Sequence, residues 1–318
     1  MMDFTANFLT QFTRSVPLFI LIGLGYYLSR SGKFSKEATS ILTRFTFYVP
    51  LTAMLFRILS QMFTKENTAD PKLMIAYFGA CFLVFSVGLL FSRKILKVSA
   101  GEASIFGTGC VFANVGLLGL PLTQAMLGDE YIPAVATVLS FNAMILWTLV
   151  SICIELSHSS GHLSVRSFVA TLKNVFKNPL ILSILAGVIW NLTEIRLPYC
   201  IDEPLRLLGN SATPLSLVVV GMGLAEYGIG AGMREGISIT IIKLCIQPLV
   251  IFFLAQLINL GPIETAAVVF IGALPCGVNV YLMSRQFRLL EGAVANAMII
   301  STAVASLTAP LVVTFLKH

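Results

Sequence analysis

Two long apolar stretches of this chain are each interrupted near the middle by glycine, proline and asparagine. The first covers residues 102–127 and reads Phe-Ala-Asn-Val-Gly-Leu-Leu-Gly-Leu-Pro at 112–121; the second covers residues 264–287 and reads Gly-Ala-Leu-Pro-Cys-Gly-Val-Asn-Val-Tyr at 272–281. Inside a bilayer, the backbone groups freed by such breaks are tolerated only where they face protein or line a cavity. A pair of interrupted spans at matching places in two halves points to a transporter's substrate site. The sequence therefore predicts a secondary transporter.

The amino-acid composition is that of a membrane protein. Hydrophobic residues make up 57% of the 318 positions and charged residues 11%, against about 25% charged in an ordinary soluble domain. The formal net charge of +6 comes from Lys and Arg in short connections between apolar runs. This is the distribution of the positive-inside rule and not the basic stripe of a nucleic-acid-binding protein. We expect the lipid bilayer as a partner, and no nucleic acid.

Ten apolar runs approach the length of about 20 residues that spans a bilayer. They cover residues 8–28, 39–61, 73–92, 103–127, 132–154, 178–193, 205–226, 237–259, 264–286 and 293–316. The most polar stretch, 157–177, divides the chain into halves 1–156 and 178–318. Prolines and an asparagine occupy corresponding positions in the two halves: Pro17 with Pro179, Pro50 with Pro214, and Asn114 with Asn279. A repeat of five spans must reverse its direction in the membrane. The predicted fold is all-α, with ten transmembrane helices in two inverted five-helix repeats and breaks in helices four and nine.

The orientation follows from the Lys and Arg counts in the connections. Connections after odd-numbered spans hold twelve, and the opposite side, termini included, holds six. The excess predicts a multi-pass protein of the plasma (inner) membrane with both termini outside and the linker 157–177 in the cytoplasm.

The two breaks predict an anion site. Half-helices that begin near Val115 and Val278 would each present free N–H groups and a partial positive charge, so a carboxylate could bind without a charged side chain. Asn114 and Asn279 are expected to cap these half-helices and donate amide hydrogens, while Gly116 and Gly277 allow close backbone approach. The predicted substrate-binding residues at the breaks are Asn114, Val115, Gly116, Pro275, Cys276, Gly277, Val278 and Asn279, with Gly119 and Pro121 shaping them. The alternative is a simple kink with small-residue packing.

Two further asparagines, Asn142 and Asn296, occupy comparable places in the spans beside the broken ones. They are expected either to line the substrate cavity or to hydrogen-bond across helices.

Several cations fall within the apolar runs. Arg44, Arg57 and Lys243 lie within a few turns of span ends, where snorkelling to the interface is the simpler explanation. Lys243 shares its span with Gln247 and Pro248 and is the candidate for a charge role.

Proton relays, metal sites and catalytic sets are not apparent in the sequence. All fifteen acidic residues fall in connections or at span ends, and none of the histidines lies in a span, which argues against a mid-membrane proton relay. His158 and His162 are spaced for a metal but sit in a Ser- and Gly-rich stretch without a third ligand, and the six cysteines are scattered. We expect no metal, no cofactor and no enzymatic activity.

The motifs carry a family resemblance. Residues 112–122 and 273–282 resemble the two crossover motifs of bacterial members of the auxin efflux carrier family, and Lys243-Leu244 followed by Pro248 is also similar to family sequences. The resemblance covers essentially the whole chain. Ala113 stands where many relatives have Gly, and the long cytoplasmic loop of many plant members is missing.

That resemblance implies an inverted-repeat fold shared with sodium/proton antiporters and bile-acid carriers. It implies a scaffold domain of helices one, two, six and seven, a transport domain of helices three to five and eight to ten, and elevator-type movement between them. It also implies homodimers for some relatives. Bacterial members are described as permeases for malate, malonate or similar carboxylates, and plant members as exporters of auxin.

The leading prediction is a carrier of small organic anions, either mono- or dicarboxylates such as malate or malonate or auxin-like weak acids. The alternative is a sodium-coupled organic-anion symporter of the bile-acid type, in which unwound carbonyls coordinate sodium. The sequence shows no catalytic or ligand set, which argues against a membrane enzyme or sensor. It also shows no rings of pore-lining charge, which argues against a channel.

Overall fold

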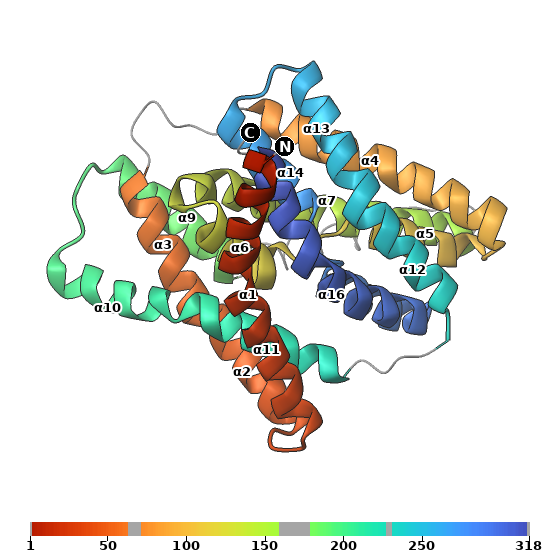
Figure 1. The fold of residues 1–318 in the computed structure, drawn as a ribbon, viewed down its shortest axis with the longest axis horizontal. Coiled ribbons are helices and arrows are strands. Elements are labelled where there is room, and N and C mark those ends of the chain that lie inside the picture. The colour runs from red at the N-terminus through yellow and green to blue at the C-terminus, as the bar shows by residue number, and fades with distance from the viewer. Residues whose placement is uncertain (1, 63–70, 159–178, 227–230, 317–318) are drawn as a thin grey trace.

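The computed structural model describes residues 2–62, 71–158, 179–226 and 231–316 (Figure 1). Most of the predicted linker 157–177, with His162, lies outside these residues. The helices up to the linker are α1 Met2–Arg30, α2 Lys36–Tyr48, α3 Pro50–Met62, α4 Pro71–Phe91, η1 Ser92–Leu96, α5 Ala100–Val111, η2 Val115–Gly119, α6 Leu120–Met126, η3 Asp129–Tyr131 and α7 Ile132–His158. Those after it are α9 Pro179–Leu192, α10 Tyr199–Asn210, α11 Ala212–Glu226, α12 Met233–Ile241, η4 Ile242–Ile246, α13 Gln247–Leu257, α14 Pro262–Gly272, α15 Val278–Phe287 and α16 Glu291–Leu316.

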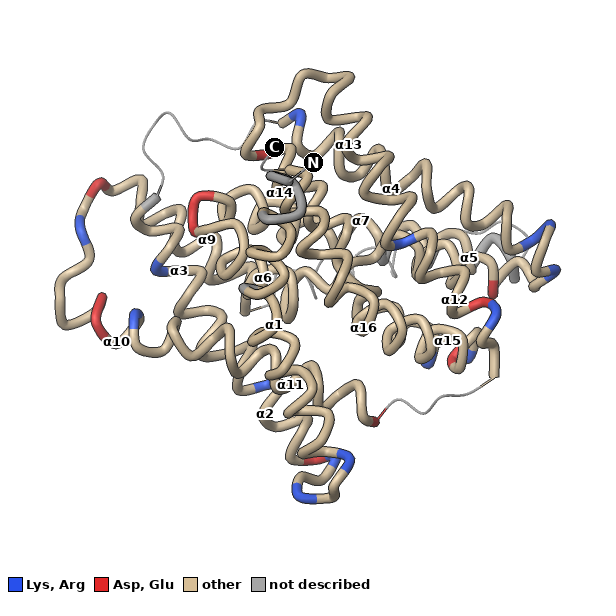
Figure 2. Tube along the Cα trace, in the orientation of Figure 1, with Lys and Arg blue, Asp and Glu red and all other residues tan. Residues whose placement is uncertain are grey.

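Seven helical segments are long and apolar enough to cross a membrane. They are Asn7–Arg30, Lys36–Gln61, Pro71–Leu96, Asp129–Ile154, Tyr199–Glu226, Met233–Leu257 and Glu291–Leu316, and shorter apolar helices cover Val115–Met126, Pro179–Leu192 and Pro262–Gly272. Charged residues gather at helix ends and in connections, with long uncharged stretches between them (Figure 2). An all-helical, multi-pass membrane protein is therefore confirmed. The count of ten spans and the inverted repeat stay predictions.

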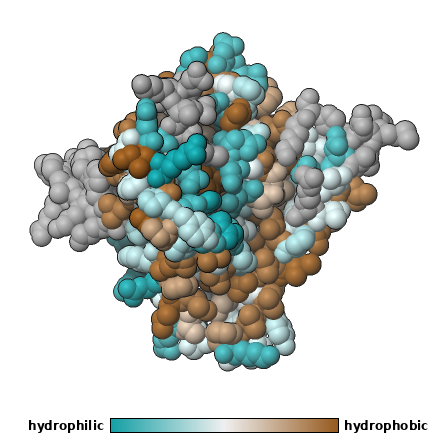
Figure 3. All heavy atoms as spheres, turned by 90° about the vertical axis from the view of Figure 1, so that its left-hand side faces the viewer, coloured by the Kyte–Doolittle hydropathy of each residue, from teal (hydrophilic) through white to brown (hydrophobic). Residues whose placement is uncertain are grey.

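The outside of the molecule suits lipid. Leu192, Phe253 and Leu257 expose 75%, 67% and 76% of their surface, and broad apolar areas lie on the face seen in Figure 3. The buried core lies between the helices, where Tyr77, Phe106 and other large side chains are inaccessible. Exposed large apolar side chains of this number would make a soluble monomer aggregate, whereas in a bilayer they contact acyl chains.

Glycines allow α1 and α11 to cross closely. A Cβ atom on Gly25 would collide with the carbonyl of Val218, and one on Gly221 would collide with the carbonyl of Ile22. In a membrane, helices associate largely through close van der Waals packing, so small residues at a crossing strengthen it. Figure 1 shows α1 lying across α11, and the ends of α1 and α16 near the two termini also lie together.

Prolines account for two wide turns in the helices. The π-helical turns Val115–Gly119 and Ile242–Ile246 each end two residues before a proline, Pro121 and Pro248 respectively. Proline has no N–H, and its ring clashes with the carbonyl four residues earlier, so the chain widens locally instead of closing a normal turn. The second of these turns contains Lys243.

Arg57 does more than snorkel. Its guanidinium donates to both carboxylate oxygens of Asp202, at 2.7 and 3.2 Å, and Gln61 donates to the same carboxylate at 2.9 Å. The pair joins α3 to α10, which also pack together. A two-pronged Arg–carboxylate pair fixes orientation better than a single contact does.

Candidate functional site

The two interrupted helices meet at their breaks. Helix α5 ends at Val111 and η2 begins at Val115, while α14 ends at Gly272 and α15 begins at Val278. We call the intervening segments, 112–114 and 273–277, the crossing. The half-helices thus begin where the sequence predicted.

The two segments of the crossing satisfy each other's backbone. The N–H of Asn114 donates to the carbonyl of Pro275 at 3.1 Å, and the N–H of Gly277 donates to the carbonyl of Phe112 at 2.8 Å. Ala113 and Cys276 form the isolated antiparallel bridge between these bonds. Non-helical backbone at membrane depth needs such partners, because lipid offers none.

Glycine is required at one side of the crossing. A Cβ atom on Gly277 would lie 2.9 Å from the carbonyl oxygen of Ala113 and 3.2 Å from that of Phe112. The close backbone approach predicted for Gly277 is therefore present. Gly116 differs, because the nearest atoms that a Cβ there would meet belong to the side chains of Phe47 and Leu180, at ordinary contact distances of 3.4 and 3.5 Å.

The predicted capping by the two asparagines is wrong. Asn114 does precede η2, but its side chain makes no capping hydrogen bond, and its backbone lies outside the usual cap geometry, with φ −79° and ψ 65°. The residue before α15 is Gly277, so Asn279 lies inside the helix. The Asn114 amide is therefore free of a capping role and available to a ligand.

Both half-helices begin with unused donors. The crossing engages the N–H groups of Asn114, Val115, Cys276 and Gly277, the third of these with the hydroxyl of Ser301 at 3.1 Å. Among the residues that the structure describes, the N–H groups of Gly116, Leu117, Val278 and Asn279 have no protein acceptor. Four such donors at two helix starts favour an anion.

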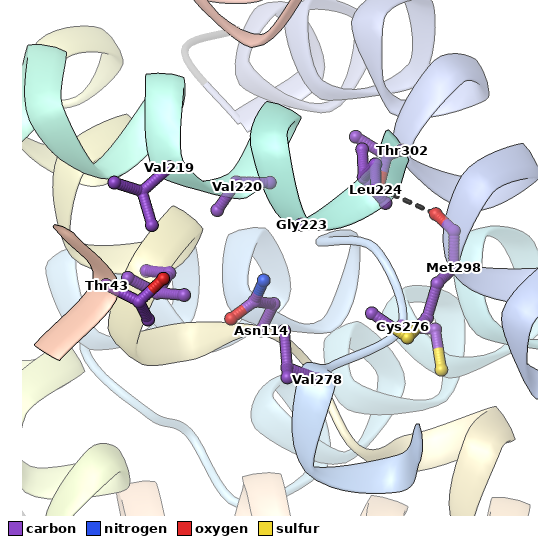
Figure 4. Close-up of a pocket in the computed structure, with 11 residues that line it drawn as sticks. Thr43, Asn114, Val219, Val220, Gly223, Leu224, Cys276, Val278, Met298 and Thr302 are labelled. Carbon is purple, nitrogen blue, oxygen red and sulfur yellow. Dashed lines mark hydrogen bonds between the residues drawn. The ribbon is translucent and has the colours of Figure 1, made fainter. Parts of the chain in front are cut away.

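A small cavity opens beside the crossing. Its volume is about 60 Å³, which leaves room for a few water molecules. The lining residues are Thr43 of α2, Asn114, Leu117 of η2, Val219, Val220, Gly223 and Leu224 of α11, Cys276, Val278 of α15, and Met298 and Thr302 of α16. Figure 4 shows the Asn114 amide among these side chains, facing α11. The described lining carries amide, hydroxyl and thiol groups and no charged side chain.

The cavity contains only part of the predicted site. Of the predicted substrate-binding residues, Asn114, Cys276 and Val278 line it. Val115, Gly116 and Pro275 adjoin it in sequence, and Gly119 and Pro121 follow in η2 and α6. Asn279, Asn142 and Asn296 are not part of the lining.

The two helical asparagines are buried elsewhere. Asn142 is 2% exposed and Asn296 is 1% exposed, and the Asn296 amide donates to the carbonyl of Ala231 at 3.4 Å. The Ala231 carbonyl lies in the connection before α12, so this bond joins α16 to a connection and not to another helix, and hydrogen bonding across helices stays a prediction.

Sequence reasoning missed the α2, α11 and α16 side of the cavity. Thr43 and Thr302 carry hydroxyl groups within two of the predicted spans, which was a usable signal, while Val219, Val220 and Met298 resemble ordinary core residues. Only packing brings these helices to the crossing.

Lys243 lies behind the crossing and does not snorkel. It is fully buried, and its ammonium donates to the carbonyl of Gly272 at 2.5 Å. Gln247, also fully buried, donates from its amide to the carbonyl of Val111 at 2.9 Å. These two carbonyls are the last of α14 and α5, so one helix holds the ends of both interrupted helices.

Apolar helices around a small cavity with a few polar groups at two helix breaks are typical of the class of membrane transporters. A family model described as "Membrane transport protein" matches residues 10–313, so the chain belongs to this family, the auxin efflux carrier family that its motifs resemble.

Individual relatives align with this chain over nearly their whole length. The chain is 25% identical over 291 residues to a putative malonate transporter of Rhizobium meliloti, covering 90% of each protein. It is 23% identical over 345 residues to auxin efflux carrier component 8 of Arabidopsis thaliana, covering 92% of this chain and 93% of the relative. An uncharacterized transporter of Methanocaldococcus jannaschii is 22% identical over 290 residues, with 89% and 91% covered. This protein is a membrane transporter and not an enzyme.

Proposed function

We propose that this transporter carries small mono- or dicarboxylates, such as malate or malonate, and holds the substrate carboxylate at the crossing. The observation that carries the proposal is the Asn114 amide in an uncharged cavity at the start of two half-helices with unused N–H donors. Fixed dipoles without a formal charge bind an anion and still release it. The relative named as a putative malonate transporter supports this substrate class.

The volume of the cavity also favours a small substrate. At about 60 Å³ it is far below the roughly 300–1,000 Å³ typical of pockets for drug-sized ligands. A malonate-sized acid fits this scale better than an indole acid or a bile acid does.

We further propose an elevator mechanism between two domains. The scaffold would comprise α1–α3 and α9–α11, and the transport domain α4–α7 and α12–α16, as ten spans in two inverted repeats. In support, α1 packs on α11 and α3 on α9 and α10, while α4 packs on α5 and α13 and α12 packs on α16. The cavity lies between α2 and α11 on one side and the crossing and α16 on the other. External termini, a cytoplasmic linker and a homodimer through the scaffold complete the proposal.

The test is thermal stabilisation of the purified protein by malonate, malate, acetate, indole-3-acetate and a bile acid. A ligand at a hundred times its dissociation constant adds about 2.7 kcal/mol to the free energy of unfolding. We expect malonate or malate to raise the melting temperature of the wild type and of Asn191→Ala, but not of Asn114→Ala. Asn191 is a matched control, since its amide donates to the Ser60 carbonyl in the scaffold, at 3.0 Å.

Two outcomes would reject the proposal: no shift with any carboxylate, or a shift that survives in Asn114→Ala. A shift that requires both sodium and a bile acid would instead favour the sodium-coupled symporter.

A further inference from the structure

The polar side chains of the cavity divide into a donor and two acceptors. The Asn114 amide offers N–H donors, and the starts of η2 and α15 add backbone N–H groups beside it. Thr43 of α2 and Thr302 of α16 carry the hydroxyl groups of the described lining. Figure 4 shows these two threonines on opposite sides of Asn114. Their role toward a substrate depends on where their hydrogens are used.

Both threonine hydroxyls use their hydrogen within their own helix. Thr43 Oγ1 donates to the carbonyl of Thr39, and Thr302 Oγ1 donates to the carbonyl of Met298, each at 2.7 Å. A hydroxyl has one hydrogen to donate and two lone pairs that accept. Because the hydrogen is held by the carbonyl four residues earlier, each oxygen presents only acceptor lone pairs to the cavity.

The surroundings make an unpaired acceptor costly. The remaining lining residues that the structure describes are the Cys276 thiol and groups without a hydroxyl or amide side chain: Leu117, Val219, Val220, Gly223, Leu224, Val278 and Met298. A buried oxygen that loses water and gains no donor is destabilising. An ionised carboxylate cannot supply that donor, since its oxygens only accept, whereas an alcohol O–H can.

Thr302 is the acceptor whose place at the crossing is fixed. The hydroxyl of its neighbour Ser301 accepts the backbone N–H of Cys276 at 3.1 Å, so α16 is tied to the segment that bridges to the strand of Asn114 through Ala113. Thr302 is also 5% exposed, against 9% for Asn114. A ligand held by Asn114 would therefore meet the Thr302 oxygen in a constant geometry.

We propose that the cavity selects 2-hydroxy carboxylates, with the carboxylate on the N–H side at Asn114 and the substrate hydroxyl donating to Thr302 Oγ1. The inference rests on the proposed function and narrows it, since it takes the same cavity as the substrate site. Thr302 is then the residue that distinguishes a hydroxy acid from the same acid without its hydroxyl. Asn114 binds both kinds of acid.

The experiment compares acids that differ only by a hydroxyl: malate with succinate, and lactate with propionate. Isothermal titration at about pH 7.5 keeps their carboxyls ionised. We expect the wild type to bind the hydroxy acid of each pair about fivefold tighter. Thr302→Val, which replaces the oxygen by a methyl group, should abolish that preference, and Thr302→Ser, which retains the oxygen, should keep it.

Thr314→Val is the matched control. Thr314 is buried in the same helix and donates to the carbonyl of Pro310, four residues earlier, at 2.8 Å, but it does not line the cavity. This variant loses the same kind of bond within α16 and should keep the wild-type preference for hydroxy acids.

Several outcomes would overturn the inference. Equal wild-type affinity for the two acids of each pair would do so even if Thr302→Val fails to fold. So would an equal loss of both acids in Thr302→Val, because the hydroxyl would then donate to the carboxylate, and so would a preference lost in Thr43→Val but kept in Thr302→Val. Equal binding leaves the proposed function standing, whereas the failure of all four acids to bind the wild type would reject that function itself.

Discussion

Gly277 donates its backbone N–H to the carbonyl of Phe112 at 2.8 Å, across 165 positions of sequence. This bond and its neighbour from Asn114 to Pro275 hold two helix breaks against each other without any side chain. The room left in the neighbouring cavity therefore depends on how closely two backbones approach.

We expect Gly277→Ala to lower both stability and substrate affinity. The new Cβ would lie 2.9 Å from the Ala113 carbonyl oxygen, and overpacking of this kind costs about 1–3 kcal/mol. Thermal melting with and without malonate measures both effects. Gly79→Ala is the control, because a Cβ there meets only Leu254, at 3.6 Å; equal melting temperatures for the two variants would contradict the prediction.

The close contact between α1 and α11 gives a second test. Gly221→Ala places a Cβ against the Ile22 carbonyl, whereas Gly23→Ala places one in open space on the same pair of helices. We expect the first to destabilise by about 1–3 kcal/mol and the second to be neutral or slightly stabilising. Denaturant or thermal unfolding in detergent would show the difference, and a neutral Gly221→Ala would mean that the helices cross less closely.

A carboxylate placed in the cavity should repel the substrate. At 4 Å and an effective dielectric constant near 20, two like charges repel by about 4 kcal/mol, so Asn114→Asp should weaken malonate binding by more than roughly 100-fold. The loss should exceed that of Asn114→Ala in isothermal titration. Equal losses in the two variants would show that the substrate charge lies far from Asn114.

Relative movement of the proposed domains can be blocked at one contact. The Thr213 hydroxyl of α11 donates to the side-chain oxygen of Gln124 on α6 at 3.2 Å, and this bond would join the proposed scaffold to the proposed transport domain. With Cys200 and Cys245 replaced by serine, cross-linking a Gln124→Cys, Thr213→Cys pair should abolish malonate flux and leave malonate binding intact.

The control for that experiment is an Arg57→Cys, Asp202→Cys pair, since the Arg57–Asp202 ion pair joins two scaffold helices. Cross-linking this pair should leave the flux unchanged. Undiminished flux through the cross-linked 124–213 protein would exclude an elevator movement at that contact.

Much of the architecture could be read from local sequence because bilayer insertion is decided locally. A run of about 20 apolar residues is the length of a membrane-spanning helix. Proline or glycine inside such a run weakens the backbone hydrogen bonding of that helix. The starts of the half-helices at Val115 and Val278 were predictable for this reason. The cap assignments to Asn114 and Asn279 failed because residue preference does not reveal backbone angles at an irregular break.

The sequence alone determined that this is a multi-pass membrane protein and that two of its apolar stretches are interrupted, because hydropathy and backbone sterics are properties of neighbouring residues. Only the tertiary structure decided what surrounds those breaks. Thr43 and Thr302 join Asn114 at the cavity, and Lys243 turns inward to Gly272 instead of outward to the interface. The direction of a long side chain and the members of a cavity are set by which helices pack together, and that depends on contacts between residues far apart in the chain.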